Sequence, residues 1–161
     1  MPPLPAPPAA PVIVAPGEGE RIAVGPSTVT LKLDSRATGG RVGAIEYTVA
    51  PRFVAPAVLH WHTKEGWVGY VAAGRVGIRF ADRSVEIDAG GMVFVPPDCP
   101  FAWFNPTDQP AKVVFLYTPG GFEQYFREAS AVAAANPGVA VKDLAPQLAA
   151  LWDQYGQMKE G

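Results

Sequence analysis

Short runs of β-branched and aromatic residues follow one another from Val12 to about Tyr117, separated by glycine, proline and aspartate. Such runs are typical of antiparallel β-strands joined by turns. The expected strands are Thr28–Leu33, Gly43–Val49, Val58–His62, Val68–Ala72, Arg75–Phe80, Ser84–Ile87, Met92–Val95, Phe101–Asn105 and Lys112–Tyr117. This many short strands predicts an all-β barrel or jelly roll, because closure of the sheet removes exposed strand edges.

After residues 119–121 the apolar period changes from that of strands to that of helices. Apolar residues then recur at three- and four-residue spacing, which predicts two C-terminal helices beginning near Phe122 and separated by residues 136–138. Asp143 is expected to cap the second helix. We expect both helices to pack on the outside of the barrel, with subunit contact as the alternative role of their apolar faces.

A chain of 161 residues with 48% hydrophobic and 17% charged residues fits a single compact domain. Prolines crowd the first residues and favour an extended arm over a sheet. The expected organisation is a proline-rich arm at 1–16, a barrel at 17–121 and the helices at 122–161. The arm is expected either to be free or to lie on a partner subunit.

The charge balance excludes some partners. Thirteen basic and fifteen acidic residues, without a basic cluster, give no surface for phosphate groups, so no nucleic-acid partner is expected. Cys99 is the only cysteine, so an intrachain disulfide is impossible and a reducing compartment is favoured. No signal-like start and no long apolar run occur, so we predict a cytoplasmic protein with no membrane partner.

The segment "HWHTKEGW" contains the only two histidines, His60 and His62. On a β-strand, His60, His62 and Val58 would face one side, while Leu59 and Trp61 would face the other. If that first side is the barrel interior, two imidazoles lie in an apolar cavity, where each needs a hydrogen-bond partner. The pair therefore indicates a functional site, with a purely structural role as the alternative.

Several segments resemble one family in order along the chain. They are "GEGERIAVG" at 17–25, "TGG" at 38–40, "IEYTVAP" at 45–51, "HWH" at 60–62 and "VVFLYTPGGFEQYF" at 113–126. Together they resemble the cupin superfamily, particularly small single-domain cupins similar to quercetin dioxygenase. The resemblance implies an antiparallel β-barrel of the double-stranded β-helix type, followed here by two C-terminal helices. It also implies a divalent metal held by three histidines and one glutamate.

This chain departs from the family motifs at half of those ligand positions. His60 and His62 match the first two histidines, but Trp67 stands where the motif has glutamate, and Glu65 lies two residues earlier. Phe101 stands in the position of the third histidine. Indole and phenyl rings donate no lone pair to a metal, so an altered, eroded metal site is expected.

The flanking motif positions support this alignment. Gly90, Pro96 and Asn105 fit the second motif, whereas Asp98 replaces its glycine. We therefore expect no cofactor. If a divalent metal such as Fe, Ni, Mn or Zn does bind, His60 and His62 are its expected ligands, and Glu65, Asp98 or Cys99 would have to complete the set.

The substituted positions predict an aromatic cavity. The expected substrate-binding residues are Trp67, Gly69, Phe101, Trp103, Asn105 and Tyr117, with Tyr47, Arg52 and Tyr70 as further polar candidates. Gly69 is included because a glycine there would leave room for a larger ligand. Such walls suit a small, planar, apolar molecule, although the rings would also simply fill the space of a lost metal.

The leading hypothesis is a metal-independent cyclase, isomerase or lyase acting on an apolar aromatic or polyketide-like substrate. His60 and His62 would act as acid and base, and Glu65 would orient one imidazole. One alternative is a metal-dependent, quercetinase-like dioxygenase with an altered ligand set. Another is a non-catalytic small-molecule-binding cupin, since one fold hosts many activities. The expected assembly is a homodimer.

Overall fold

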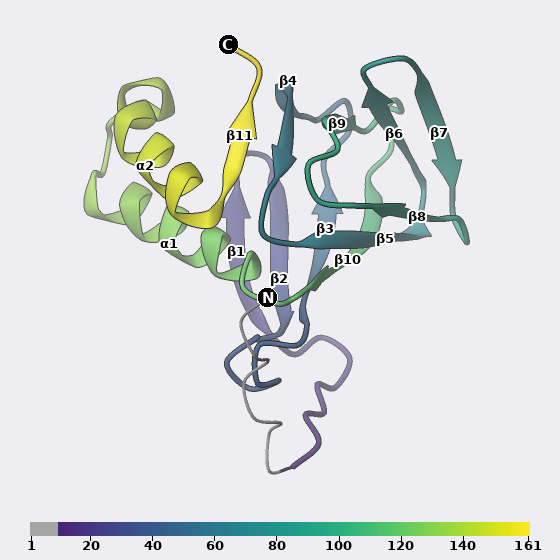
Figure 1. Cartoon of the computed structure of the whole chain (residues 1–161), viewed down its shortest axis with the longest axis horizontal. Coiled ribbons are helices and arrows are strands. Elements are labelled where there is room, and N and C mark those ends of the chain that lie inside the picture. The colour runs from purple at the N-terminus through teal and green to yellow at the C-terminus, as the bar shows by residue number, and fades with distance from the viewer. Residues whose placement is uncertain (1–9) are drawn as a thin grey trace.

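The computed structural model of the chain describes residues 10–161, except for the side chains of 55–57 and 141–142. Two antiparallel sheets face each other and form a barrel, and two helices lie beside it (Figure 1). This confirms the predicted all-β barrel with C-terminal helices. Of the proline-rich arm expected at 1–16, residues 1–9 lie outside the described residues.

The six-stranded sheet has the order β1-β2-β3-β10-β5-β8, and the five-stranded sheet has the order β11-β4-β9-β6-β7. The strands of the first sheet are β1 (Glu20–Val24), β2 (Ser27–Leu33), β3 (Gly43–Val49), β10 (Ala111–Thr118), β5 (Gly66–Ala73) and β8 (Met92–Val95). Those of the second are β11 (Gln157–Lys159), β4 (Val54–His62), β9 (Phe101–Phe104), β6 (Arg75–Phe80) and β7 (Ser84–Asp88). Sequential strands mostly lie in opposite sheets, as in a jelly roll.

All nine expected strands form, three of them with the predicted limits, and two further strands appear. β1 was not predicted because only two of its residues, Ile22 and Val24, face the interior, which is too short an alternation to recognise from the sequence. β11 has three residues and exists through its pairing with β4, at Gln157 with His62 and Lys159 with His60. Neither strand carries enough local information to be recognised alone.

Alternation along β4 fails before the histidines. Val58, expected to face inward, is 44% exposed, whereas His60 and His62 are buried. The pairing of β4 with β9 shifts register between residues 55 and 60, so the strand is not regular over its whole length. The expectation for Val58 was wrong because it assumed an unbroken period of two.

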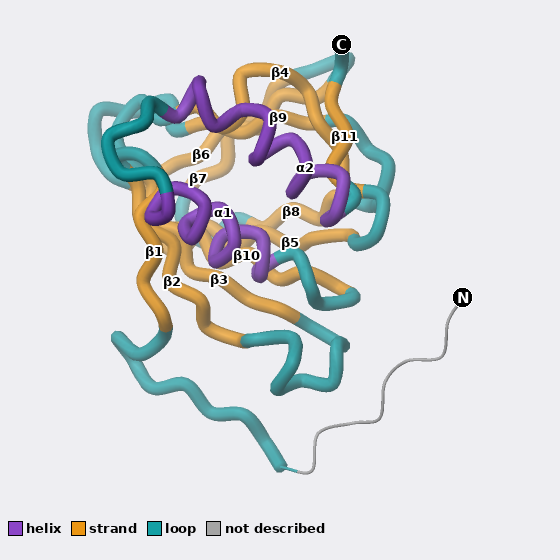
Figure 2. Tube along the Cα trace, turned by 90° about the vertical axis from the view of Figure 1, so that its left-hand side faces the viewer, coloured by secondary structure: helices purple, strands orange, loops and turns teal. Residues whose placement is uncertain are grey.

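The helical region contains α1 (Glu123–Ala135), the 3₁₀ turn η1 (Val141–Leu144) and α2 (Ala145–Tyr155). Asp143 does not cap α2, because it lies inside η1 and Leu144 occupies the cap position without a side-chain hydrogen bond. Seen from the side, the helices lie across the open end of the barrel (Figure 2). In residues 10–161, neither helix is long and apolar enough to cross a membrane.

The barrel interior is packed at one end and hollow at the other. Beyond Trp67 and Trp103, side chains such as Val71, Ile78 and Val113 leave a void of only about 10 Å³. These residues come from strands of both sheets, and burying each removes a large apolar area from water. The rings of Trp67 and Trp103 thus form the floor of the remaining space, which faces the helices.

Candidate active site

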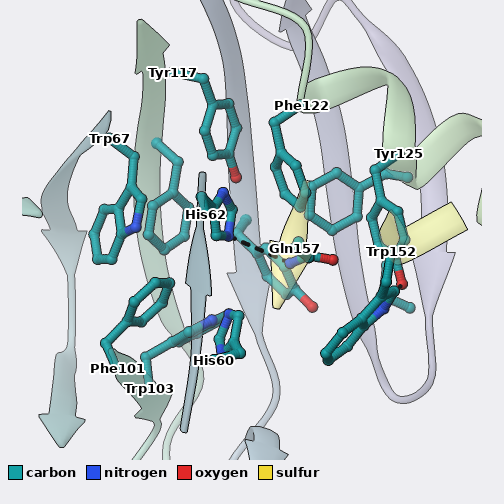
Figure 3. Close-up of a pocket in the computed structure, with 14 residues that line it drawn as sticks. His60, His62, Trp67, Phe101, Trp103, Tyr117, Phe122, Tyr125, Trp152 and Gln157 are labelled. Carbon is teal, nitrogen blue, oxygen red and sulfur yellow. Dashed lines mark hydrogen bonds between the residues drawn. The ribbon is translucent and has the colours of Figure 1, made fainter. Parts of the chain in front are cut away.

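A cavity of about 230 Å³ lies between the barrel and the C-terminal helices. The barrel contributes Val24, Tyr47, His60, His62, Trp67, Phe101, Trp103, Phe115 and Tyr117, and the C-terminal region contributes Phe122, Tyr125, Phe126, Trp152 and Gln157. Figure 3 shows the two imidazoles between the rings of the barrel and those of the helical region. The wall is therefore aromatic on both sides of the histidines.

Strand alternation and pairing explain how the barrel residues meet. On β10, alternate side chains are buried, which brings Phe115 and Tyr117 to the interior. Tyr117 pairs with Trp67 on β5, and His60 on β4 pairs with Phe101 on β9. The predicted residues His60, His62, Trp67, Phe101, Trp103 and Tyr117 all line one cavity, together with the further candidate Tyr47.

His62 forms a buried pair with Glu65. Its Nδ1 lies 2.5 Å from Glu65 Oε1, and the two side chains are only 5% and 4% exposed. An ionised carboxylate only accepts hydrogen bonds, so with Glu65 in that form Nδ1 carries the proton and donates it. Glu65 does not line the cavity, and its hydrogen bond to Nδ1 restricts the orientation of the His62 ring.

The opposite nitrogen of His62 faces Gln157. His62 Nε2 lies 3.3 Å from the amide Nε2 of Gln157, drawn as the dashed line in Figure 3. In a neutral ring protonated on Nδ1, Nε2 has a free lone pair, which here accepts the amide N–H. The rings of Phe122, at 4.3 Å, and Phe101, at 5.7 Å between centroids, lie close to His62 and limit its rotation.

His60 has a different environment. Its ring lies 4.3 Å from that of Phe101 and 6.0 Å from that of Trp152, and its Nδ1 is buried without a hydrogen-bond partner in the described chain. Burial, assisted by the neighbouring His62, lowers the pKa of His60 to about 3. His60 is therefore a neutral imidazole near neutral pH.

The C-terminal region supplies cavity residues that sequence reasoning missed. Gln157 reaches His62 through the pairing of β11 with β4, and Trp152 reaches the cavity from α2. Trp152 Nε1 donates to the Tyr125 hydroxyl at 3.0 Å, which ties α2 to α1. Side chains of both helices line the cavity, a role that the expected packing on the outside of the barrel did not include. The apolar stripe through Trp152 and Tyr155 was visible in the sequence, but nothing there showed what it covers.

Four candidates lie elsewhere. Gly69 is not in the cavity wall, and an added β-carbon would lie 3.2 Å from the Trp67 ring and 3.5 Å from Phe115, so Gly69 gives room to its neighbours and not to a ligand. Asn105 is buried but uses its side chain in a loop, where its amide donates to Ala50 O at 3.2 Å and to Gln109 O at 2.8 Å. Arg52 pairs on the surface with Asp108, and Tyr70 is 40% exposed.

Residues 45–117 match the family model of the cupin domain. This part of the barrel is a cupin domain. Its fold is similar to that of KdgF from a Halomonas species, with a TM-score of 0.61, 14% identity and coverage of 71% of this chain and 99% of that one. The fold is also similar to that of the polyketide cyclase RemF from Streptomyces resistomycificus, with a TM-score of 0.59 and 19% identity. That match covers 69% of this chain and 81% of the RemF chain. An RmlC-like cupin from Shewanella frigidimarina has a TM-score of 0.59 and 16% identity to this chain. That match covers 71% of this chain and 96% of the other. No curated protein sequence matches the chain.

The donor set of this barrel does not fit the four-ligand metal site that the resemblance implies. Around His60 and His62, the remaining two ligand positions hold Trp67 and Phe101. The Glu65 carboxylate is hydrogen-bonded to His62 Nδ1 and does not line the cavity. In the described part of the chain, no three His, Cys, Asp or Glu side chains lie close enough together to hold a metal ion. Asp98 and Cys99 therefore do not complete a site with the two histidines. Two imidazoles alone bind a divalent ion weakly.

Proposed function

We propose that this cupin is a metal-independent enzyme that transfers protons on a small, apolar, carbonyl-bearing molecule, in an isomerisation, cyclisation or elimination. The observation that carries the proposal is the Glu65–His62 pair at the wall of an aromatic cavity. A carboxylate that holds Nδ1–H fixes the tautomer in which Nε2 is a base, and it stabilises the imidazolium that forms when Nε2 takes a proton.

In the proposed reaction, the Gln157 amide N–H moves away from His62 Nε2 when substrate binds, and the freed lone pair removes a proton from the carbon beside the substrate carbonyl. The electrons of that C–H bond pass into the carbon skeleton, and the carbonyl oxygen becomes an enolate. The His62 imidazolium then returns the proton to another carbon in an isomerisation, or to the leaving group in an elimination. In a cyclisation, the enolate carbon bonds to a second carbonyl carbon, whose oxygen takes the proton. Each route is redox-neutral.

His60 enters this proposal as a neutral group. With a pKa of about 3, it holds no imidazolium proton at neutral pH and orients the substrate by hydrogen bonding and ring contact instead. The surrounding rings exclude water, which strengthens the interactions of an enolate with nearby donors. Support for ring closure is at the level of fold, since a protein named as a polyketide cyclase shares the cupin barrel.

The test is exchange of the acetyl protons of 2-acetylnaphthalene for deuterium in D₂O, followed by proton NMR. The wild-type protein is expected to accelerate exchange above buffer. His62→Gln should reduce this acceleration at least about 100-fold, the lower range for loss of a general base, and Glu65→Gln at least about tenfold. Glu86→Gln, a surface carboxylate paired with Arg75, is the matched control and should exchange like the wild type.

Two outcomes would overturn the proposal. Ligand binding without any His62-dependent exchange would favour a non-catalytic binding cupin.

Elemental analysis of the dialysed protein after incubation with iron, nickel, manganese or zinc addresses the dioxygenase alternative. Retention near one metal per chain, lost in His60→Ala, would contradict a metal-independent reaction, whereas substoichiometric metal in every condition would contradict the dioxygenase.

A further inference from the structure

Three cavity residues each carry a buried polar atom without a hydrogen-bond partner in the described chain. These atoms are His60 Nδ1, Trp67 Nε1 and Gln157 Oε1. Their residues are only 3%, 2% and 6% exposed, so water does not reach them freely. Buried polar atoms in proteins are almost always paired, because an unpaired one loses its hydration without compensation. All three residues line the same cavity, which suggests that its ligand supplies the missing partners.

The chemistry of two of these atoms is fixed. The indole Nε1–H of Trp67 only donates, so it requires an acceptor such as a carbonyl oxygen. The amide Oε1 of Gln157 only accepts, so it requires a donor such as a hydroxyl group. Figure 3 places Trp67 and Gln157 on opposite sides of the His62 ring. A ligand that satisfies both therefore passes in front of His62, with a carbonyl toward β5 and a hydroxyl toward β11.

The cavity also limits the size of the ligand. An apolar cavity of about 150 Å³ holds one benzene ring. A space of about 230 Å³ therefore encloses one or two fused rings, and the third ring of a larger system would have to leave the enclosing side chains. Because the enclosing side chains are mainly aromatic, a flat ring system makes more contact than a flexible chain of the same volume.

We propose that the ligand is a planar hydroxy-ketone of one or two fused rings. Its carbonyl oxygen accepts from Trp67 Nε1–H, and its hydroxyl donates to Gln157 Oε1. The proposal rests on the proposed function only for the position of the acidic carbon beside His62. In that reaction, Trp67 is the group that stabilises the enolate oxygen, because its N–H points at the atom on which negative charge develops.

The test compares four naphthalene probes by titration calorimetry: 6-acetyl-2-naphthol, 2-acetylnaphthalene, 2-naphthol and naphthalene. The probe with both polar groups is expected to bind most tightly, and naphthalene most weakly. Each single hydrogen bond should change affinity by roughly three- to tenfold. The three-ring 2-acetylanthracene should bind more weakly than 2-acetylnaphthalene, although it has more apolar surface.

Two variants separate the hydrogen bonds. Trp67→Phe should weaken binding of both ketones and leave 2-naphthol unchanged. Gln157→Met should weaken binding of both naphthols and leave 2-acetylnaphthalene unchanged. Trp152→Phe is the matched control, since its indole N–H already donates to Tyr125 and it should not discriminate between ketone and non-ketone probes.

The proposal is overturned if Trp67→Phe and Gln157→Met change all four affinities equally, or if neither changes any. It is also overturned if the three-ring probe binds as tightly as its two-ring counterpart. These results are independent of turnover. If the binding test fails but deuterium exchange still depends on His62, the proposed ligand class is wrong and the proposed function stands. If the probes bind selectively but no exchange is accelerated, the proposed function is wrong and the ligand class stands.

Discussion

The pH dependence of stability should report the unusual environment of His60. The pKa of His60 falls from 6.5 to about 3 on burial, so below pH 6.5 the unfolded chain binds a proton that the folded chain does not. His60 therefore leaves stability unaffected above pH 6.5 and lowers it as the pH falls toward 3. Between pH 6.5 and 5, the free energy of unfolding should decrease by at most about 2 kcal/mol from this group.

Urea unfolding of the wild type and His60→Gln at several pH values measures this effect. The difference in slope between the two proteins isolates His60 from His62 and from the carboxylates, whatever the cost of the substitution itself. We expect the variant to lose less stability between pH 6.5 and 5. Parallel slopes would show that His60 takes up a proton in the folded state as easily as in the unfolded chain.

Single residues differ in how well the sequence predicted them. Motif spacing placed Phe101 and Trp67 in the cavity correctly, and the backbone agrees with that alignment. Asp98, which stands at the motif glycine, has a φ of 62°, and its N–H donates to His62 O at 2.8 Å. Asn105 fitted the motif equally well but serves a loop. Spacing fixes where the backbone passes, whereas only packing decides which side-chain hydrogen bonds form.

At the scale of elements, periodicity predicted the two helices but not the surface against which they pack. An amphipathic stripe shows that a helix has a buried face and carries no information about the surface that covers it. Here the covered surface is the open end of the barrel, which makes Trp152 part of the site. β11 is the extreme case, because three residues gain a strand conformation only from pairing with β4. Gln157 could not have been predicted for that reason.

The turn between α2 and β11 should control the position of Gln157. Gly156 has a φ of 70°, and an added β-carbon would lie 2.5 Å from Thr63 Oγ1. Its carbonyl also accepts from Thr63 N at 2.8 Å, which fixes β11 beside the end of β4. Gly156→Ala is therefore expected to lower the free energy of unfolding by about 2 to 3 kcal/mol and to weaken binding of 6-acetyl-2-naphthol.

Gly138 offers the matched control. Its φ is 79°, and no atom lies within 4 Å of the position of an added β-carbon. Gly138→Ala should cost about 1 kcal/mol from the backbone conformation alone and leave the affinity unchanged. Denaturant unfolding and calorimetric titration of both variants make the comparison. Equal effects on affinity would mean that the position of β11 is not set by the contact with Thr63.

At the scale of the whole molecule, one face of the barrel exposes several large apolar side chains to solvent. Met92 and Phe94, on the edge strand β8, are 65% and 60% exposed, and the neighbouring Tyr70 on β5 is 40% exposed. Edge strands with apolar side chains promote pairing between chains unless they are covered. Contact through β8 would extend the six-stranded sheet or bury its outer face, at a distance from the helices that cover the cavity.

We expect this face to form the homodimer contact. Sedimentation velocity of the wild type should then give a dimer, and Phe94→Lys together with Met92→Lys should weaken it at least about tenfold, because a buried lysine at the centre of an apolar interface lacks a partner. Val139→Lys, at a residue 44% exposed in the loop between α1 and η1, controls for added charge. Neither substitution on β8 touches the cavity, so ligand affinity should be retained in the monomer. A wild type that sediments as a monomer would show that no homodimer forms. A dimer that both β8 substitutions leave unchanged would show that the contact lies on another face.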